Sequence, residues 1–309
     1  SFCVQYRAID LFAGVGNHNV FLFKYLPQPI RSNRTSMKAF WILLSALLAL
    51  FSLFVGQIEL DVANLLDRTS MDYRILVELR IPRVVGAFLV GGVLALSGML
   101  FQSIFRNALA SPYTLGVASG ASFGVAVAIV WGYATLSYLF GFLGAISTLL
   151  IHLLFSMRVR YYDKDSMLLI GIAMSFFYSA GLMVVLYLSD LKQNYAIVRF
   201  TMGSLDIAKH DVWALAMSAL ATLVLTKRYQ KDIQLMLVSY DYALLKGVNS
   251  AKSSYIILSI LSVAIGVVVS IVGPIGFVGL IIPHIIQRCL LYTSPSPRDR
   301  TRSRMPSSA

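Results

Sequence analysis

The stretch VVGAFLVGGVLALSGMLFQSIF, residues 84–105, runs for 22 residues without a charged side chain. An α-helix rises 1.5 Å per residue, so about 20 residues cross the ~30 Å hydrocarbon core of a bilayer. A second run of this kind, SYIILSILSVAIGVVVSIVG, covers residues 254–273. Counted in this way, eight segments are predicted to span a membrane: 39–57, 84–105, 112–132, 136–157, 166–188, 209–226, 254–273 and 275–291.

The composition excludes an ordinary soluble domain. Of the 309 residues, 58% are hydrophobic and only 13% are charged, about half of the ~25% that soluble domains carry. So few charged side chains cannot cover the surface of a soluble protein of this size. We therefore predict an all-α fold, a polytopic transmembrane helical bundle.

The net charge of +12 could suggest nucleic-acid binding, but half of it lies at the two ends of the chain. Residues 1–36 and residues 292–309 each carry a net charge of +3, and the stretch between them holds 18 basic and 12 acidic residues. We therefore expect no nucleic-acid partner.

Both ends also differ from the middle in composition. Residues 292–309 are rich in Ser, Pro and Arg and cannot bury enough apolar surface to order themselves. We interpret them either as a disordered basic tail beside anionic lipid or, preferably, as non-native sequence. Residues 1–36 lack a membrane-helix pattern and precede Met37, so they are interpreted as a non-native or disordered extension. The membrane domain is assigned to residues 37–291.

The N-terminal extension contains the segment DLFAGVG, Asp10–Gly16, which resembles the nucleotide-binding loop of cytosine DNA methyltransferases. That loop needs a preceding strand, a following helix and a nearby acidic residue. Only nine residues precede it here, and proline-containing coil follows soon after. A methyltransferase fragment is therefore the least favoured hypothesis.

Basic residues are distributed unevenly over the connections between the predicted spans. With the N-terminus in the cytoplasm, the connections on the cytoplasmic side carry 11 basic and 4 acidic residues, and those on the opposite side carry 7 basic and 8 acidic residues. Cytoplasmic loops of membrane proteins carry an excess of Lys and Arg. The distribution therefore predicts a cytoplasmic N-terminus.

Charged side chains are few in the predicted spans and lie near helix ends, as Arg83 and Arg288 do. Buried Asp, Glu or Lys residues mark the ion relays of coupled carriers, so a secondary transporter is the less favoured alternative and the energy is expected to come from elsewhere. Cys3 and Cys289 are too few and too far apart for a metal site. We expect no metal site, no disulfide and no catalytic residue.

Two segments rich in glycine and proline are expected to shape the spans. Ser111 and Pro112 form a favourable helix start, and glycines follow at positions 116, 120 and 124. This four-residue spacing favours close helix packing. The segment Gly273–His284 holds two prolines and three glycines, which must break or tilt a helix. For His284 we expect a packing or helix-end role rather than ligand binding.

Five motifs then occur in one order along the chain: LRIPR at 79–83, Gly92–Gly98, NALASP at 107–112, LGVASGA at 115–121 and Gly273–His284. Together they resemble the FecCD-type (type II) permeases of ABC importers for iron–siderophore complexes, haem and vitamin B12. The resemblance covers about Met37 to Leu291.

The resemblance implies a homodimeric or pseudo-dimeric permease with ten helices per half. About eight are present here, and nothing after Leu291 resembles the last two, so the permease domain is expected to be C-terminally truncated. The implied location is the bacterial cytoplasmic (inner) membrane. The chain has no Walker A sequence, which fits ATP use by a partner subunit and no cofactor bound to the permease. The implied partners are cytoplasmic ATPase subunits, an extracytoplasmic substrate-binding protein, a second permease protomer and membrane lipid.

The resemblance also implies roles for particular residues. Arg80 and Arg83 would grip acidic residues of the binding protein, the alternative being interfacial snorkelling beside lipid headgroups. The segment 239–248 would dock on the ATPase, the alternative being a solvated or interface-lying helix. The residues that this coupling role implicates are Ser239, Asp241, Ala243 and Gly247. The segment 190–210 resembles the short outer helix that follows the fifth span. The translocation pathway and its helix kinks are assigned to Asn107, Pro112, Gly116, Gly120, Gly203, Gly273, Pro274, Gly276, Gly279, Pro283 and His284.

Overall fold

The computed structural model describes residues 34–56, 67, 70–158 and 164–292, and within these ranges the chain is helical without a strand. The all-α prediction is therefore confirmed. The extension 1–33, with its Asp10–Gly16 motif, and the tail 293–309 lie outside the described residues. The elements are α2 Arg34–Phe54, α3 Met71–Arg74, η3 Ile75–Arg80, α4 Ile81–Phe105, α5 Val117–Val130, η4 Ala134–Leu136, α6 Ser137–Arg158, α7 Lys164–Leu188, α8 Leu191–Met202, α9 Asp211–Val238, α10 Tyr240–Leu245, α11 Ser250–Val272 and α12 Val278–Tyr292.

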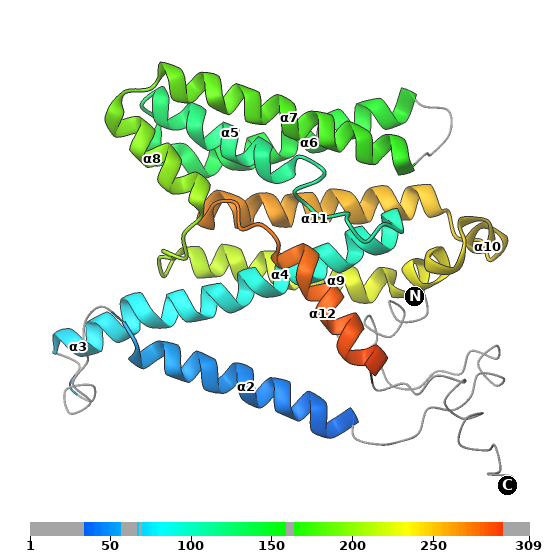
Figure 1. Cartoon of the computed structure of the whole chain (residues 1–309), viewed down its shortest axis with the longest axis horizontal. Helices are drawn as coiled ribbons and strands as arrows, with labels where there is room; N and C mark the ends of the chain where they lie inside the picture. Colours follow the sequence, from blue (N-terminus) through cyan, green and yellow to red (C-terminus); the bar gives the residue numbers. More distant parts are fainter. Residues whose placement is uncertain (1–33, 57–66, 68–69, 159–163, 293–309) are drawn as a thin grey trace, which may run out of the picture.

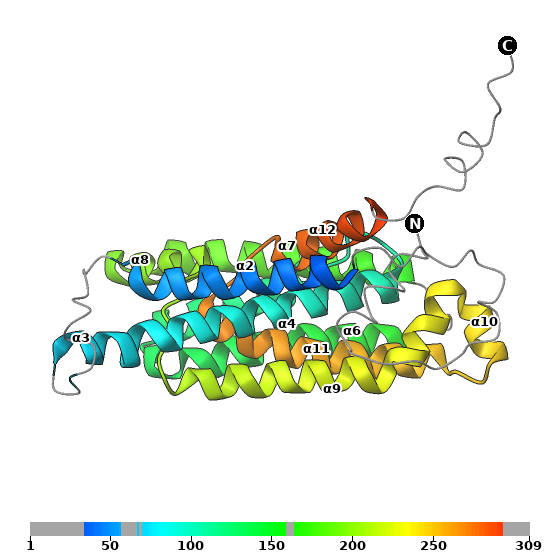
Figure 2. The ribbon, with the colours of Figure 1, turned by 90° about the horizontal axis from the view of Figure 1, so that it is seen from below.

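Most of the long helices run lengthwise between the two ends of a bundle (Figures 1 and 2). We call these the α8 end, which includes η3 and the segments 131–136, 189–210 and 273–277, and the α10 end, which includes the segments 106–116 and 239–249. Helices α4, α9 and α11 pack against one another in the middle of the bundle. Helices α5, α6 and α7 cover one side of this group, and α12 and α2 contact α4 on the other.

Four helices of the described chain are long and apolar enough to cross a membrane: 71–105, 134–152, 168–188 and 250–272. Two shorter apolar helices, 40–54 and 117–130, correspond to the predicted first and third spans. The predicted sixth span, 209–226, forms the first part of the 28-residue helix α9. The predicted eighth span, 275–291, corresponds to the 15-residue helix α12.

The prediction that Ser111 and Pro112 start a helix is wrong. The Ser111 amide instead donates to Thr114 Oγ1 over 2.9 Å, and Thr114 Oγ1 donates back to the Ser111 carbonyl over 2.8 Å, which closes a turn. The helix begins only after Gly116, whose φ of 78° places it in the left-handed region that interrupts a right-handed helix. Residues 106–116 therefore form a compact connection between α4 and α5.

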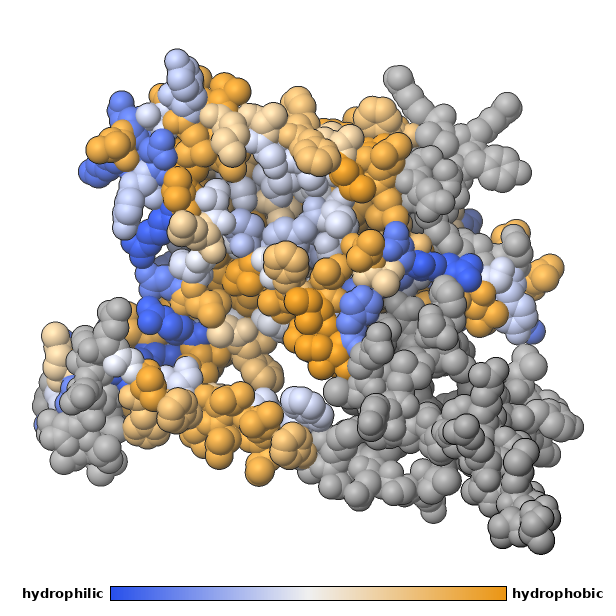
Figure 3. All heavy atoms as spheres, in the orientation of Figure 1, coloured by the Kyte–Doolittle hydropathy of each residue, from blue (hydrophilic) through white to orange (hydrophobic). Residues whose placement is uncertain are grey.

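The main hydrophobic core joins the last three turns of α4 to α5, α9 and α11, with Phe101, Leu100 and Ile104 fully buried. Many large apolar side chains point outward instead. Hydrophobic residues cover the face of α2 that Figure 3 shows. On the same helix, Ile42 and Leu43 are each 69% exposed. Exposed apolar belts of this kind suit contact with lipid or with another apolar surface.

Glycines bring α5 and α6 into close contact, as their spacing predicts. A Cβ atom on Gly120 would lie 2.6 Å from the Gly144 carbonyl oxygen, and one on Gly124 would collide with the Phe140 carbonyl oxygen. Thr148 Oγ1 donates to the carbonyls of Gly116 and Gly144 at 3.3 and 3.2 Å, respectively. Larger residues at these glycines would force the two helices apart.

Candidate functional site

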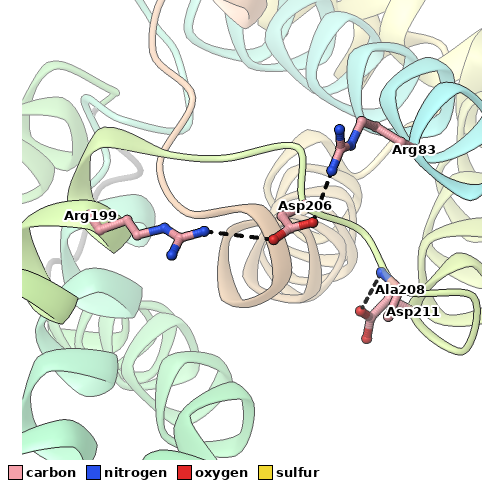
Figure 4. A network of polar contacts seen from close by, with 5 residues as sticks. All are labelled: Arg83, Arg199, Asp206, Ala208 and Asp211. Atoms are coloured by element: carbon pink, nitrogen blue, oxygen red, sulfur yellow. Dashed lines mark hydrogen bonds and ion pairs between the residues drawn. The ribbon is translucent and has the colours of Figure 1, made fainter. Parts of the chain in front are cut away.

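The α8 end carries an exposed network of charges in which Asp206 lies between two arginines (Figure 4). Arg83 Nη2 lies 3.1 Å from Asp206 Oδ1, and Arg199 Nη2 lies 3.7 Å from Asp206 Oδ2. The three side chains are 53% (Arg83), 65% (Arg199) and 62% (Asp206) exposed. The network therefore links the first turn of α4, the last turn of α8 and the loop 203–210 at the surface.

The same loop is fixed from within by two further contacts. Asp211 is buried and its Oδ2 accepts the Ala208 amide over 3.2 Å, as Figure 4 shows. Ile207 is buried against α4, where a Cβ on Gly86 would collide with its side chain. The backbone near Asp206 is therefore held in place while the Asp206 carboxylate stays open to solvent.

Arg80 is placed differently from Arg83, in a position that does not favour the docking role that the resemblance implies for it. Its side chain is buried, with 8% of its surface exposed. Its Nη1 donates to the carbonyls of Leu53 at 2.7 Å and Phe54 at 3.0 Å. These carbonyls belong to the last turn of α2, where a helix lacks its own donors. Arg80 therefore ties the end of α2 to the helix that contains η3 and α4.

Two predicted pathway glycines, Gly203 and Gly273, meet at the α8 end. Both have a φ of 74°, and a Cβ on Gly273 would lie 3.0 Å from the Gly203 Cα. The Ser204 amide donates to the Val272 carbonyl over 2.8 Å. The end of α8 and the end of α11 are thus joined backbone to backbone. We call this contact the glycine junction.

The predicted break in the segment Gly273–His284 lies at its start. Helix α11 ends at Val272, the next five residues are not helical, and α12 begins at Val278. Pro274 lies in this break beside Gly203, and Gly276 is exposed with no atom within 4 Å of an added Cβ. Pro283, by contrast, lies inside α12, which continues past it with His284 half-buried.

Helix α12 crosses α4 at two further glycines, and here the structure adds a residue that the sequence analysis missed. A Cβ on Gly98 would collide with the Gly279 carbonyl, and the Gln102 Nε2 donates to the Leu280 carbonyl over 3.2 Å. Pro283 has no amide hydrogen to donate to the Gly279 carbonyl. The α4 face formed by Gly98 and Gln102 therefore packs on the part of α12 where proline disturbs the helix.

The connection between α4 and α5 lies at the α10 end. Asn107 Oδ1 accepts the Leu109 amide over 2.9 Å, which stabilises the first turn of the connection. Pro112 is buried and lies near Gly279, so the structure brings these two predicted pathway residues together. His152 of α6 was not predicted from the sequence, and its Nε2 lies 3.0 Å from the Leu115 carbonyl, where it holds the end of the connection.

A cavity of about 20 Å³ lies beside His152, lined by Phe105, Leu115, Val117, Leu149, Tyr255, Leu258 and Ser262. It has room for roughly one water molecule, and pockets for ligands of drug size measure ~300–1,000 Å³. This cavity therefore has no room for a large substrate. Among the described residues no cluster of His, Cys, Asp and Glu could hold a metal ion.

The predicted coupling segment forms the short helix α10 between α9 and α11. Ser239 ends α9 in extended backbone, and the backbone of Asp241 lies in α10. Ala243 is buried in the main core, and its carbonyl accepts the Val248 amide over 3.0 Å. Gly247 is exposed with a φ of 80°, a conformation that favours glycine.

The exposed surface of α10 consists of residues that the sequence analysis did not single out. Leu244 is 68% exposed and Leu245 is 84% exposed. Ala243 faces the opposite way, so its small side chain allows α10 to pack against the rest of the bundle. The apolar pair Leu244–Leu245, rather than Ala243, is available to a partner at this end.

Comparison with known proteins identifies the family. The model of the FecCD transport family matches residues 43–296. The hemin transport system permease protein HmuU of Yersinia pestis is 34% identical over 263 residues, which cover 81% of this chain and 78% of HmuU. The vitamin B12 import system permease protein BtuC of Vibrio vulnificus is 29% identical over 250 residues, covering 80% and 75% of the two chains.

A solved structure agrees with these relatives. An inward-facing conformation of a metal-chelate type ABC transporter superposes with a TM-score of 0.71 at 26% identity, covering 84% of this chain and 88% of the other. With its apolar helices, the chain is a multi-pass protein of the inner membrane. Because the family match covers well over half of its length, the chain belongs to the FecCD transport family and is the permease subunit of an ABC importer, in which a separate ATPase subunit hydrolyses ATP.

Proposed function

We propose that this permease moves an iron–siderophore complex, haem or a related metal chelate or cofactor across the inner membrane. The names of the relatives support a cargo of this class, since they include transporters of hemin, vitamin B12 and iron chelates. The cargo is a substrate that passes through, so the permease needs no cofactor of its own. The observation that carries the proposal is that an exposed charged network and an exposed apolar pair lie at opposite ends of the same bundle, where two different partners could bind.

The first of these surfaces is the charged α8 end, which we assign to the extracytoplasmic side. Arg83 is exposed there and can pair with a carboxylate of the substrate-binding protein. The connections assigned to this side carry 7 basic and 8 acidic residues, against 11 and 4 at the α10 end. The positive-inside rule thus supports a cytoplasmic α10 end and a cytoplasmic N-terminus.

The second surface is α10, which we assign to the ATPase. Exposed Leu244 and Leu245 offer an apolar contact, and Gly247 leaves room for the close approach of a partner backbone. Helix α10 packs on α9 and α11. A movement of the ATPase that displaces α10 would therefore be carried by two long helices toward the α8 end.

At the far end of these helices lies the glycine junction, which joins α8 to the end of α11. We propose that the junction and the segment 273–277 form part of the outer mouth of the pathway. The pathway itself is proposed to lie between two protomers, in a homodimer or a heterodimer, with lipid around the remaining apolar surface.

The test is transport by the full chain, reconstituted in liposomes with its ATPase and binding protein. We expect uptake of a ferric siderophore to require ATP inside the liposomes and to stop when the ATPase carries an inactivating Walker A substitution. Uptake that continues without ATP and follows a proton or sodium gradient would refute the proposal.

A variant of α10 tests the coupling role separately. Replacing Leu245 by Asp places a charge on the proposed ATPase contact, and we expect ATP-driven uptake to fall at least ten-fold because the subunits no longer bind well. Lys252→Asp is the matched control, since it adds an acid at the same end on an exposed site of α11. Equal loss of uptake in the two variants would contradict the assignment of α10.

A further inference from the structure

Asp206 forms an ion pair with Arg83, the arginine that the proposed docking surface needs. Its Oδ1 lies 3.1 Å from Arg83 Nη2, and Arg83 is the docking arginine that stays exposed, because Arg80 is buried against α2. An external carboxylate can therefore bind Arg83 fully only by competing with Asp206. Asp206 lies in the segment 190–210 but outside the five motifs that carry the family resemblance.

The geometry of the pair makes this exchange feasible. The contact is made through one oxygen and one nitrogen, and the second arginine, Arg199, is farther away at 3.7 Å. Exposed ion pairs of this kind contribute little to stability. Arg80 shows the contrast, since its side chain is buried and already donates two hydrogen bonds of 2.7 and 3.0 Å to α2.

The loop backbone next to Asp206 is held by contacts that do not involve Arg83, so it can keep its position when the carboxylate leaves Arg83. Asp211 holds the Ala208 amide, and Ile207 is buried against α4. Arg199 remains within reach of the released carboxylate. An incoming carboxylate would therefore exchange one ion pair for another without unfolding the loop.

We propose that Asp206 is an internal substitute for the carboxylate of the binding protein: it neutralises Arg83 in the undocked permease and is displaced on docking. This inference rests on the proposed docking role of Arg83. The exchange lowers the affinity of the permease for the binding protein, because the new ion pair with Arg83 forms at the expense of the existing pair with Asp206. Moderate affinity allows the binding protein to leave after delivery.

The exchange also connects docking to the glycine junction. Asp206 follows Gly203 and Ser204, which contact the end of α11, and the Arg83 contact ties this loop to α4. Docking would release that tie and leave the loop attached to α8 and α11. The outer ends of α4 and α11 would then be less tightly linked when substrate arrives.

The experiment measures the affinity of the cognate binding protein, purified without chelate and fluorescently labelled, for the full-length permease in nanodiscs. Asp206→Asn keeps the shape of the side chain and frees Arg83, so we expect the Kd to fall about three-fold or more at 0.15 M salt, which is the scale of an exposed ion pair. Glu78→Gln is the matched control. Glu78 is an exposed acid of η3 at the same end, and its neutralisation changes the net charge equally without touching the pair.

A double variant distinguishes the exchange of ion pairs at Arg83 from a general effect of surface charge on docking. In an Arg83→Gln permease, Asp206→Asn should leave the Kd unchanged, because the arginine proposed to dock is no longer there to be freed. Equal tightening by Asp206→Asn and Glu78→Gln, or weaker binding by Asp206→Asn, would overturn the proposal. If Asp206→Asn elutes as aggregate, Asp206→Ser serves the same comparison. If Arg83→Gln alone leaves the Kd unchanged, the docking role of Arg83 is refuted. If Arg83→Gln weakens binding but Asp206→Asn changes the Kd no more than Glu78→Gln does, only the exchange is refuted.

Discussion

Gly98 lies where α4 crosses α12, and replacing it by alanine should separate the two helices. The added Cβ would lie 2.7 Å from the Gly279 Cα and closer still to the Gly279 carbonyl oxygen. Ordinary contact begins at 3.4 Å, so α12 must move by about 0.7 Å relative to the Gly279 Cα, and by more relative to the carbonyl. Backbone atoms leave no flexible side chain to absorb this shift.

Three effects determine how Gly98→Ala changes the free energy of unfolding. Overpacking costs about 1–3 kcal/mol. A shift of this size also breaks the 3.2 Å hydrogen bond from Gln102 to the Leu280 carbonyl, which costs about 0.5–1.5 kcal/mol. Alanine favours the helix more than glycine does, which offsets the loss by about 0.5–1 kcal/mol. We therefore expect a net loss of about 0.5–4 kcal/mol, which corresponds to a drop of roughly 1–8 °C in the unfolding midpoint of a chain this long.

Gly92 provides the control on the same helix. An added Cβ there meets no atom within 4 Å, so Gly92→Ala should gain the helix-propensity term alone and raise the midpoint slightly. The assay is the fraction of monodisperse permease that survives a series of temperatures in detergent, read by gel filtration. Equal midpoints for Gly98→Ala and Gly92→Ala would refute the reasoning, since the two differ in packing and not in propensity.

Two further substitutions test other contacts of the bundle. Arg80→Gln removes the charged donor from the Leu53 and Phe54 carbonyls, so α2 should separate from α4 and become more accessible to protease, while Arg74→Gln, on an exposed site, should leave the digestion pattern unchanged. Gly116→Ala places a side chain at a φ of 78° and within 3.2 Å of Thr148 and Met174, which should lower the unfolding midpoint by more than Gly132→Ala does. Gly132 has a φ of 80° and open space around it, so it carries the conformational strain of about 1–2 kcal/mol without the contact, and equal effects would contradict a packing role for Gly116.

The sequence predicts the helices of this protein well because apolar length is a local property. The run at 84–105 lies within the helix that the structure extends back to residue 71, and the glycines at 120 and 124 pack against α6 as their spacing indicates. The break after Val272 was also predictable, since Gly273 and Pro274 together stop a helix.

The differences between these expectations and the structure have a common physical origin, which is that a side chain's role depends on what lies opposite it. Arg80 and Arg83 are three residues apart and look equivalent in sequence, yet only Arg80 meets the carbonyl groups that end α2. Ala243 and Leu245 lie in one short helix, and the packing of α10 decides that the small residue is buried and the large one exposed. The left-handed backbone of Gly116, which delays the start of α5, likewise depends on the turn made by Ser111 and Thr114.

Pro283 shows how such a contact could nevertheless be sought in a sequence. A proline inside a membrane helix leaves a carbonyl without its intrahelical donor, and the bilayer core offers no water to replace it. Another helix can pack closely on such a turn, and here residues 98 and 102 do so: Gly98 allows contact with the Gly279 carbonyl, which Pro283 leaves without its donor, and Gln102 donates to the neighbouring Leu280 carbonyl. Residues four apart lie on one face of a helix. A small residue followed four positions later by Gln or Asn in an otherwise uncharged span is therefore a pattern that predicts the partner of a proline-containing helix, although the partner lies 178 residues away in the chain.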